Sequence, residues 1–155
     1  MSNERIAQYL PDGLPSPVAE PDGLSLQFWN GLRGSRLMIQ RCAHCATWIF
    51  APEWICHSCH SFDLEWQEVE PRGRIFSWER VWRASHPALS TATPYLAVLV
   101  ELASADNVRM LGNLHGDPLQ NVQIGACVSG IFEHHEHANP PYSLLQWQLT
   151  RQPAR

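Results

Sequence analysis

Four cysteines in two Cys-x-x-Cys pairs form the pattern with the clearest chemical meaning in this sequence. They are Cys42, Cys45, Cys56 and Cys59, and ten residues separate the two pairs. Two residues between thiolates let one tight turn present both sulfurs to one ion, and two such turns complete a tetrahedral shell. The spacing predicts a structural zinc site, with iron in a rubredoxin-like site as the alternative because its ligands and geometry are the same.

This metal centre is predicted to stabilise the fold and not to catalyse. Four protein ligands leave no open coordination position for a substrate. A thiol redox role is disfavoured because one cysteine pair would suffice for it. His44, His57 and His60 stand beside the cysteines and are expected to be exposed, with exchange of one of them for a cysteine ligand as the alternative.

The fifth cysteine and a histidine cluster are the other candidates for chemistry. Cys127 would be the nucleophile of a free-standing enzyme, with His134, His135 or His137 as the base. However, Cys127 stands in an alternating apolar stretch, where a free cysteine usually packs as a small hydrophobe. The His-His-Glu-His segment at 134–137 lacks the spacing of a zinc-protease helix, and we expect a polar loop there. We therefore assign no catalytic residue.

Composition narrows the functions that these residues can serve. The chain has 155 residues, 45% hydrophobic and 17% charged, enough for one ordinary domain or two small ones. All 11 basic residues are arginine, which excludes a lysine Schiff base and a P-loop lysine. The net charge of -4 argues against a nucleic-acid-binding surface. No secretory signal or membrane-spanning apolar run is visible, so we expect a soluble, cytoplasmic protein.

The elements that must position these residues are mainly short strands. Residues 1–22 are rich in proline and are expected to form an extended arm. Residues 23–70 are predicted to hold a short helix, at about 23–33, and the zinc ribbon. Alternating apolar residues predict five further strands, at 74–82, 94–102, 108–114, 126–132 and 143–149. Five strands broken by glycine, proline and asparagine turns favour an OB-fold barrel over 71–150, so the predicted fold class is mainly β.

Several stretches of the sequence resemble one known family. Its N-terminal signature resembles FWNGLRGSRLMIQRCAHC at 28–45, and its later motifs resemble AP at 51–52, CHSC at 56–59, LEW at 64–66, GRIFSW at 73–78, PYLAVLVEL at 94–102, LGNL at 111–114 and IGACVSGIFE at 124–133. The family is the zinc-ribbon/OB-fold acyl-CoA-associated proteins, long carried as a domain of unknown function. Two residues depart from its pattern. Ala46 replaces a glycine, which predicts a wider first cysteine turn, and Cys127 replaces a frequent proline.

The resemblance implies an accessory subunit. Proteins of this family resemble the small partners of thiolase-like enzymes: thiolases, steroid side-chain aldolases and acyltransferases. In such systems the thiolase-fold subunit carries the catalytic residues, and the zinc-ribbon protein supports it and helps to enclose the acyl-CoA. We therefore expect a hetero-oligomer with a thiolase-fold partner and an acyl-CoA ligand, without nucleic acid or membrane.

Two residue sets are candidates for these contacts. The first is a group of arginines that are expected either to form a solvated, ion-paired face or to clamp the phosphates of coenzyme A: Arg72, Arg74, Arg80 and Arg83. The second is a group of aromatic residues that exceeds what a small ribbon can cover, and that is expected to dock on the partner: Phe28, Trp29, Trp48 and Trp54. Because zinc ribbons and OB-folds also bind nucleic acids, a single-stranded nucleic-acid-binding module stays an alternative, as does the free-standing enzyme.

Overall fold

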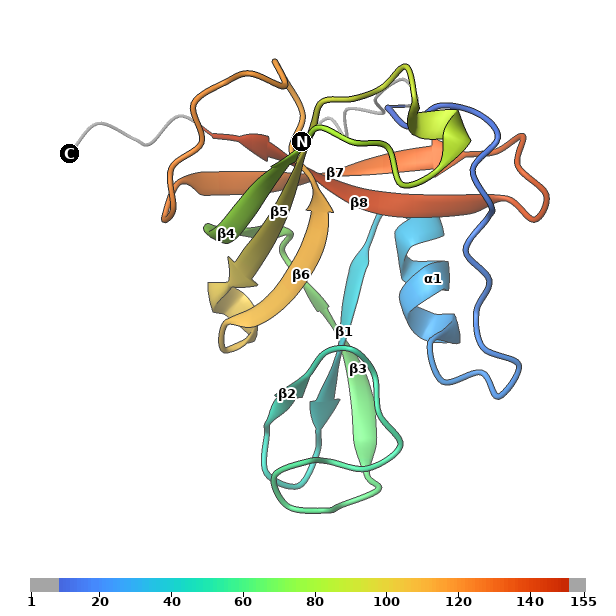
Figure 1. Cartoon of the computed structure of the whole chain (residues 1–155). Helices are drawn as coiled ribbons and strands as arrows, with labels where there is room; N and C mark the ends of the chain where they lie inside the picture. The colour runs from blue at the N-terminus through green and yellow to red at the C-terminus, as the bar shows by residue number, and fades with distance from the viewer. Residues whose placement is uncertain (1–8, 151–155) are drawn as a thin grey trace.

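Most regular elements of the described chain are β-strands, as the alternating apolar pattern predicts (Figure 1). The computed structural model describes residues 9–150. Its elements are α1 (Leu26–Arg33), β1 (Leu37–Cys42), β2 (Trp48–Ile49), β3 (Leu64–Val69), β4 (Arg72–Val81), the 3-10 turn η1 (Pro87–Leu89), β5 (Tyr95–Leu102), the 3-10 turn η2 (Ala103–Ala105), β6 (Val108–Asn113), β7 (Cys127–His135) and β8 (Tyr142–Leu149).

The zinc ribbon is a small antiparallel sheet in the order β2–β1–β3. Strand β1 pairs with β3 over its whole length, from Leu37 opposite Val69 to Cys42 opposite Leu64. The two strands run from the barrel into the ribbon, which projects from the rest of the molecule in Figure 1. They therefore carry the cysteine turns away from the barrel.

The second sheet is a nearly closed antiparallel barrel in the order β6–β5–β4–β7–β8. A parallel bridge between Leu114 and Trp147 brings the two outer strands together. Gly112 allows this approach, because a Cβ atom there would lie 2.8 Å from the Trp147 indole. The mainly β class with a five-stranded OB-fold barrel is thus confirmed.

The core is divided unequally between the two sheets. One large cluster joins the barrel interior to Leu32 of α1 and to Leu37 and Ile39 of β1, so the helix and the base of the ribbon share the core of the barrel. The ribbon has a second cluster in which only Cys42, Ile49 and Cys56 are fully buried. A core of this size, two-thirds of it cysteine, cannot balance the chain entropy of the ribbon by apolar burial alone.

Two local predictions need correction. The helix begins at Leu26, not at residue 23, because the chain turns over residues 21–25 before it enters the helix. The loop predicted at 134–137 is wrong for its first half, since His134 and His135 are the last residues of β7. The part of the N-terminal arm that the structure describes, from Tyr9, has no regular element and lies along α1 and the β7–β8 hairpin (Figure 1); residues 1–8 lie outside the described chain.

Candidate functional site

The ribbon gathers its four cysteine thiols into one group. The sulfur atoms of Cys42, Cys45, Cys56 and Cys59 all lie within 4.8 Å of one another. The Cys42–Cys59 and Cys45–Cys56 sulfur pairs are each 3.6 Å apart. Tetrahedral coordination with Zn–S bonds of about 2.3 Å requires sulfur atoms roughly 3.8 Å apart. The donor set and its spacing therefore fit a zinc ion, and they fit iron equally well.

The two cysteine turns have the same backbone geometry. Ala46 donates to the Cys42 carbonyl and His60 donates to the Cys56 carbonyl, both at 2.9 Å. The residue that closes each turn is left-handed, with φ of 63° at Ala46 and 60° at His60. The wider first turn expected from Ala46 is therefore not observed, because alanine adopts the conformation that glycine would take more easily.

The surroundings of the thiols favour metal binding without histidine. The Thr47 hydroxyl lies 3.1 Å from the Cys45 sulfur, and its hydrogen bond lowers the pKa of that thiol to about 6. A thiolate is the form that binds metal, so this shift favours binding through Cys45. At Cys59 the Ser61 backbone hydrogen bond lowers the pKa, but burial and the neighbouring thiols raise it to about 12. His44, His57 and His60 are exposed, as expected, and none belongs to the metal-ligand group found among residues 9–150.

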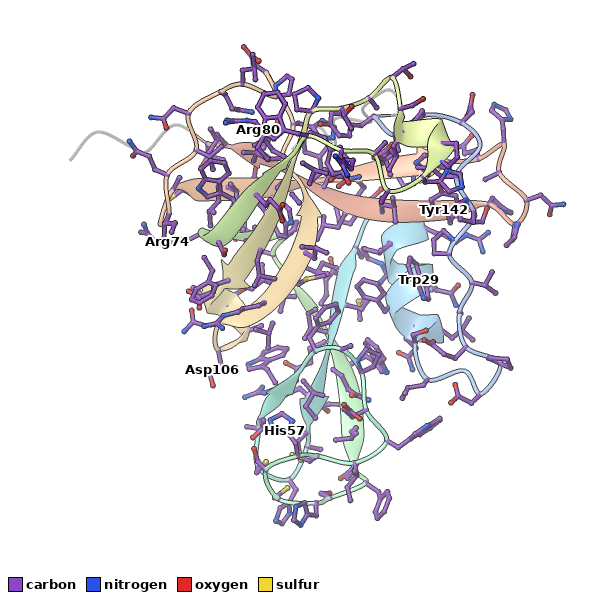
Figure 2. The ribbon with its side chains drawn as sticks, viewed as in Figure 1. Trp29, His57, Arg74, Arg80, Asp106 and Tyr142 are labelled. Atoms are coloured by element: carbon purple, nitrogen blue, oxygen red, sulfur yellow. The ribbon has the colours of Figure 1, made fainter. Side chains whose placement is uncertain are left out.

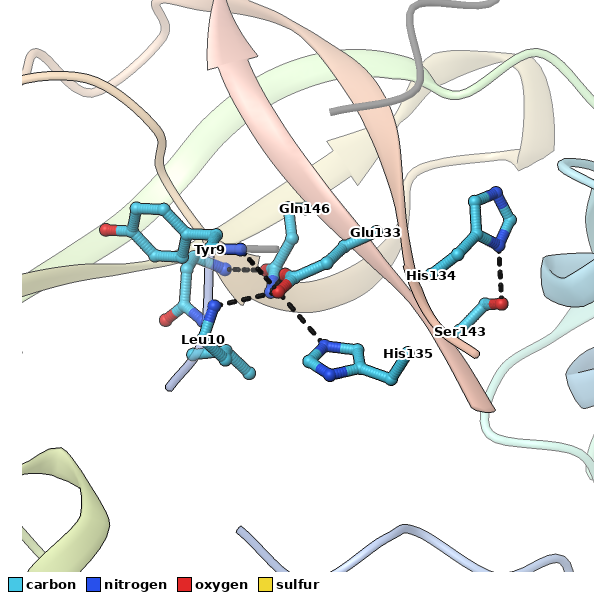
Figure 3. A network of polar contacts seen from close by, with 8 residues as sticks. Tyr9, Leu10, Glu133, His134, His135, Ser143 and Gln146 are labelled. Carbon is cyan, nitrogen blue, oxygen red and sulfur yellow. Dashed lines mark hydrogen bonds and ion pairs between the residues drawn. The ribbon is translucent and has the colours of Figure 1, made fainter. Parts of the chain in front are cut away.

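A second polar centre lies where the arm crosses the β7–β8 hairpin (Figure 3). Glu133 is 0% exposed, and its Oε1 accepts hydrogen bonds from the backbone amides of Tyr9 and Leu10 at 2.7 and 2.8 Å. The same oxygen lies 3.0 Å from Nε2 of His135, and Oε2 accepts from Gln146 Nε2 at 2.8 Å. Oε1 of Gln146 accepts a hydrogen bond from the backbone amide of Asn113 at 2.7 Å, which links the network to β6.

This network is buried although it lies on the outer face of the barrel. Phe132 and Leu145 belong to the core cluster, so their neighbours Glu133 and Gln146 point to the opposite face of the strands. The arm covers that face and supplies two donors. Burial raises the pKa of Tyr9, and the charge of Glu133 raises it further. Sequence reasoning missed Glu133 and Gln146 because polar residues at these positions match an ordinary exposed face.

Cys127 and the histidines are too far apart to act as nucleophile and base. Cys127 begins β7 and His134 is seven residues further along the same strand, roughly 23 Å away at about 3.3 Å per residue. His134 contacts other groups, the hydroxyls of Ser143 at 2.7 Å and Ser35 at 3.1 Å. His137 is exposed beyond the end of β7.

Three of the four arginines are spread along β4 and Arg83 follows its end, so the four do not form a single clamp. Arg72 and Arg80 are separated by eight residues of β4, roughly 25 Å. Arg72 pairs with Glu70 at 2.6 Å, and Arg80 donates to the carbonyls of Pro118 and Gln120 at 2.7 and 2.8 Å. Figure 2 shows Arg74 and Arg80 toward opposite ends of the strand.

Arg74 and Arg83 lie at the surface. Arg74 is exposed and donates to the Gly125 carbonyl at 3.2 Å. Arg83 is also exposed and follows the end of β4. Arg72 is exposed as well but is paired with Glu70, and the guanidinium of Arg80 is held by two carbonyls of the 114–126 loop, so Arg74 and Arg83 are the two without a described ion pair or such a two-carbonyl clamp.

The aromatic residues are covered to very different degrees. Phe28, Trp29 and Trp48 are partly buried against the core cluster of the chain itself. The expectation that the ribbon leaves all of these rings uncovered was therefore too simple, because α1 and the base of the ribbon lie against the barrel. In contrast, Trp54 is 57% exposed, and Phe62, which sequence reasoning did not single out, is 77% exposed in the same 50–63 loop.

A small cavity separates α1 from the ribbon. It has a volume of about 240 Å³. Its lining consists of Phe28, Trp29, Phe50, Ala51 and Pro52, and on the side of the arm and the helix start Glu20, Leu24 and Ser25. The Phe28 ring contacts Trp29 at 5.3 Å and Phe50 at 5.5 Å between centroids. The partly buried aromatic cluster therefore borders an apolar depression open to a partner or a ligand. None of the helices in the described part of the chain has the length and apolar character needed to cross a membrane.

Comparison with known proteins adds family information to this geometry. Residues 29–65 match the family model of the ChsH2 rubredoxin-like zinc ribbon domain, and residues 66–132 match that of the ChsH2 C-terminal OB-fold domain. A chain of the solved Ltp2-ChsH2(DUF35) aldolase superposes with a TM-score of 0.73 and 28% identity, covering 86% of this chain and 98% of that one. A DUF35-family protein of unknown function from Sulfolobus solfataricus has a TM-score of 0.55 at 18% identity, covering 85% and 87%, and shares the fold.

Two curated relatives are similar over part of their length. A probable enoyl-CoA hydratase alpha subunit of Thermomonospora curvata is 34% identical over 112 residues, which are 72% of this chain and 33% of the relative. The 3-oxo-4,17-pregnadiene-20-carboxyl-CoA hydratase alpha subunit of Mycobacterium tuberculosis is 29% identical over an aligned length of 157 positions, and the alignment covers 94% of this chain and 48% of the relative. The chain thus spans at most about half the length of these relatives. The two domain models and the superposition on the Ltp2-ChsH2(DUF35) aldolase chain identify the same family. This chain therefore belongs to the ChsH2 family of rubredoxin-like zinc-ribbon/OB-fold proteins.

Proposed function

We propose that the chain is a non-catalytic accessory subunit that binds zinc through its ribbon and supports a thiolase-fold partner acting on acyl-CoA. The reaction would cleave or form a carbon–carbon bond, as in a thiolase or a steroid side-chain aldolase, or transfer an acyl group. The observation that carries this proposal is the similarity along 98% of a chain from an Ltp2-ChsH2(DUF35) aldolase. The names of the two curated relatives, both subunits of hydratases, support a role in a lipid-metabolising assembly.

The geometry of the chain supports a role without catalysis. The metal-ligand group has four cysteine donors and leaves no coordination position for substrate. Cys127 has no histidine within reach along its strand. The proposal therefore assigns the nucleophile and the base to the partner, and assigns to this chain the binding of zinc through Cys42, Cys45, Cys56 and Cys59.

The partner surface is proposed on the ribbon and α1. The 50–63 loop exposes Trp54 and Phe62, and the partly buried ring cluster of Phe28, Trp29 and Trp48 lies at the base of the ribbon. Large exposed rings of this kind serve as central anchors in protein interfaces. Trp54 and Phe62 contribute little to the fold when exposed, so they test docking without disturbing the core.

Replacing both exposed rings is expected to weaken assembly strongly. The double variant Trp54→Ala/Phe62→Ala should lower the affinity for the thiolase-fold partner at least about 30-fold, the effect of losing aromatic anchors. Calorimetric titration with the purified partner measures it. The matched control is Leu111→Ala, which removes a side chain that is 72% exposed on β6, outside the proposed interface. Equal affinity of the double variant and the control would contradict docking through this loop.

Contact with the coenzyme A part of the substrate is proposed for Arg74 and Arg83. Arginine forks suit phosphate oxygens, and both side chains are exposed. In the assembled complex, Arg83→Ala is expected to raise the KM for an acyl-CoA about five-fold, as loss of one exposed charge pair does. The KM for the corresponding acyl-pantetheine ester should not change, because that ester lacks the nucleotide. Steady-state kinetics with both substrates tests this. An equal change for the two esters would show that Arg83 does not contact the nucleotide.

A further inference from the structure

We propose that a cavity between the N-terminal arm and the β7–β8 hairpin binds a primary alkylammonium group, which donates a hydrogen bond to Nδ1 of His135. The cavity has a volume of about 390 Å³, within the range of small-ligand sites. The arm forms one wall with residues 11–16, and the hairpin forms the other with His135, His137 and Tyr142. This cavity contains none of the metal-binding cysteines, and it lies next to the part of the proposed partner surface that includes Trp29.

The hydrogen-bond network fixes which nitrogen of His135 carries a proton. The backbone amides of Asn113, Tyr9 and Leu10 can only donate. The Gln146 oxygen must therefore face Asn113, and its NH2 group must donate to Glu133. A carboxylate can only accept hydrogen bonds, as Glu133 does from Tyr9 and Leu10. Nε2 of His135, which lies 3.0 Å from Glu133 Oε1, therefore carries the proton and donates it to this bond. In the neutral ring, Nδ1 is then an acceptor with a lone pair.

Nδ1 of His135 is the ring nitrogen that does not contact Glu133, and the ring that carries it lines the cavity. The His135 side chain is only 5% exposed and lines the cavity wall. Figure 3 shows the second ring nitrogen on the side away from Glu133. Among residues 9–150 no hydrogen bond reaches this atom. The unpaired side-chain atoms of the described residues that are shut off from solvent are His115 Nε2 and Trp147 Nε1, so Nδ1 of His135 keeps some contact with solvent. A buried, oriented acceptor is thus presented to the cavity.

The charge around the cavity favours a cation. Asp12 is the one carboxylate in the described lining, and Glu133 lies directly behind His135. Burial raises the pKa of Tyr142, and the charges of Glu133 and Asp12 raise it further, which shows that both carboxylates act on this wall. Neither arginine nor any other permanent cation is present in the described lining. A carboxylate or phosphate ligand would be repelled, whereas an ammonium group would be attracted.

The apolar part of the ligand has a place beyond Tyr142. The Tyr142 ring stacks on His135 at 4.4 Å and also lines a second cavity of about 140 Å³, where Val18, Leu26 and Trp29 provide apolar walls. Arg33 lies on that second cavity and disfavours a cation there. A short alkylamine would therefore place its ammonium group at His135 and Asp12, with its chain along Tyr142 toward Trp29.

A titration with three six-carbon probes tests the proposal on the zinc-loaded full chain. At pH 8, hexylamine is protonated. Hexylamine is expected to shift the His135 ring nitrogen signals and the Trp29 indole signal saturably, whereas hexanoate and hexan-1-ol bind at least about five-fold more weakly. Absence of a saturable shift at His135 with hexylamine overturns the proposal. Equal binding of hexanoate or hexan-1-ol overturns it as well.

Two variants identify the site. His135→Phe keeps an aromatic ring for the stack on Tyr142 and removes Nδ1, so it should abolish the hexylamine response. Because this variant also removes a donor to Glu133, Asp12→Asn provides a second test on the exposed arm, at a residue outside the hydrogen bonds described for Glu133. It should weaken hexylamine binding about five-fold, as loss of one exposed charge pair does. Unchanged hexylamine affinity in Asp12→Asn overturns the assigned position of the ammonium group.

Discussion

Cys56→Ala is expected to abolish stoichiometric metal binding and to unfold the ribbon while the barrel stays folded. Cys56 is 0% exposed and supplies one of the four sulfurs. Metal binding at such sites contributes on the order of 10–16 kcal/mol. The ribbon core has only Ile49 and two cysteines as fully buried residues, so little else holds this segment. The barrel has its own large cluster and should keep its strands.

Metal analysis and amide hydrogen exchange measure this result together. In the variant, the zinc content should fall from about one ion per chain to a small fraction of that. Amide protection should disappear around 42–64 and persist in β5 and β7. Cys127→Ala is the matched control, since it removes a thiol outside the metal group and should retain full metal content. A metal-free Cys56→Ala protein with a protected ribbon would show that the metal does not hold this segment.

Glu133→Ala is expected to cause the second largest loss, about 3–5 kcal/mol in the free energy of unfolding, or roughly 10–15 °C in Tm. The substitution leaves Gln146 Nε2, His135 Nε2 and the amides of Tyr9 and Leu10 without their acceptor. A buried donor without an acceptor destabilises the folded state. Water can replace the lost acceptor only if the arm opens and lets it in. The arm should therefore detach first, and the outer face of β7 and β8, which the arm covers, should become accessible to water.

Calorimetry and hydrogen exchange at Tyr9 and Leu10 test this effect. Glu136→Ala is the matched control, because Glu136 is an exposed glutamate three residues further along the chain. Its effect should stay within about 0.5 kcal/mol. A Glu133→Ala protein with wild-type Tm and protected arm amides would mean that the arm is held by other contacts, and that the carboxylate is not its anchor.

The features that local sequence patterns predict correctly are those with local causes. Strand β5 alternates Leu96, Val98, Val100 and Leu102 inward, and the structure buries these four completely. The cysteine spacing predicted two turns that bring sulfurs together, and the thiols do lie within 4.8 Å. Both depend on residues a few positions apart, for which strand alternation and tight-turn geometry are sufficient.

The features that sequence reasoning missed depend on contacts between distant segments. Glu133 bonds to amides 123 and 124 residues earlier in the chain, and no local pattern encodes such a pairing. The segment at 134–137 was expected to be a loop because it lacks the spacing of a zinc-protease helix and its flanks are typical of loops. The covering arm turns the outer face of β7 into a buried one, so polar residues can continue the strand there.

The aromatic residues show the same division. The sequence predicted more large rings near the ribbon than the ribbon can cover, and the structure shows that the chain itself partly buries Phe28, Trp29 and Trp48. Leu32 and the base of β1 join the barrel core, and this tertiary contact covers part of Phe28 and Trp29. The loop that carries Trp54 and Phe62 has no such neighbour and leaves both rings largely in solvent. The packing of α1 against β1 and β8 therefore explains why Phe28 and Trp29 are partly buried while Trp54 and Phe62 are exposed.

Co-purification from cells that express the tagged chain at its native level tests the central claim most directly. The account predicts a complex with a thiolase-fold subunit that acts on an acyl-CoA, with no turnover by the isolated zinc-loaded chain. It also predicts that Cys127→Ser leaves the activity of the complex unchanged. A chain that purifies alone and by itself cleaves or transfers an acyl-CoA, with this activity lost in Cys127→Ser, would contradict the account and make the protein an enzyme in its own right.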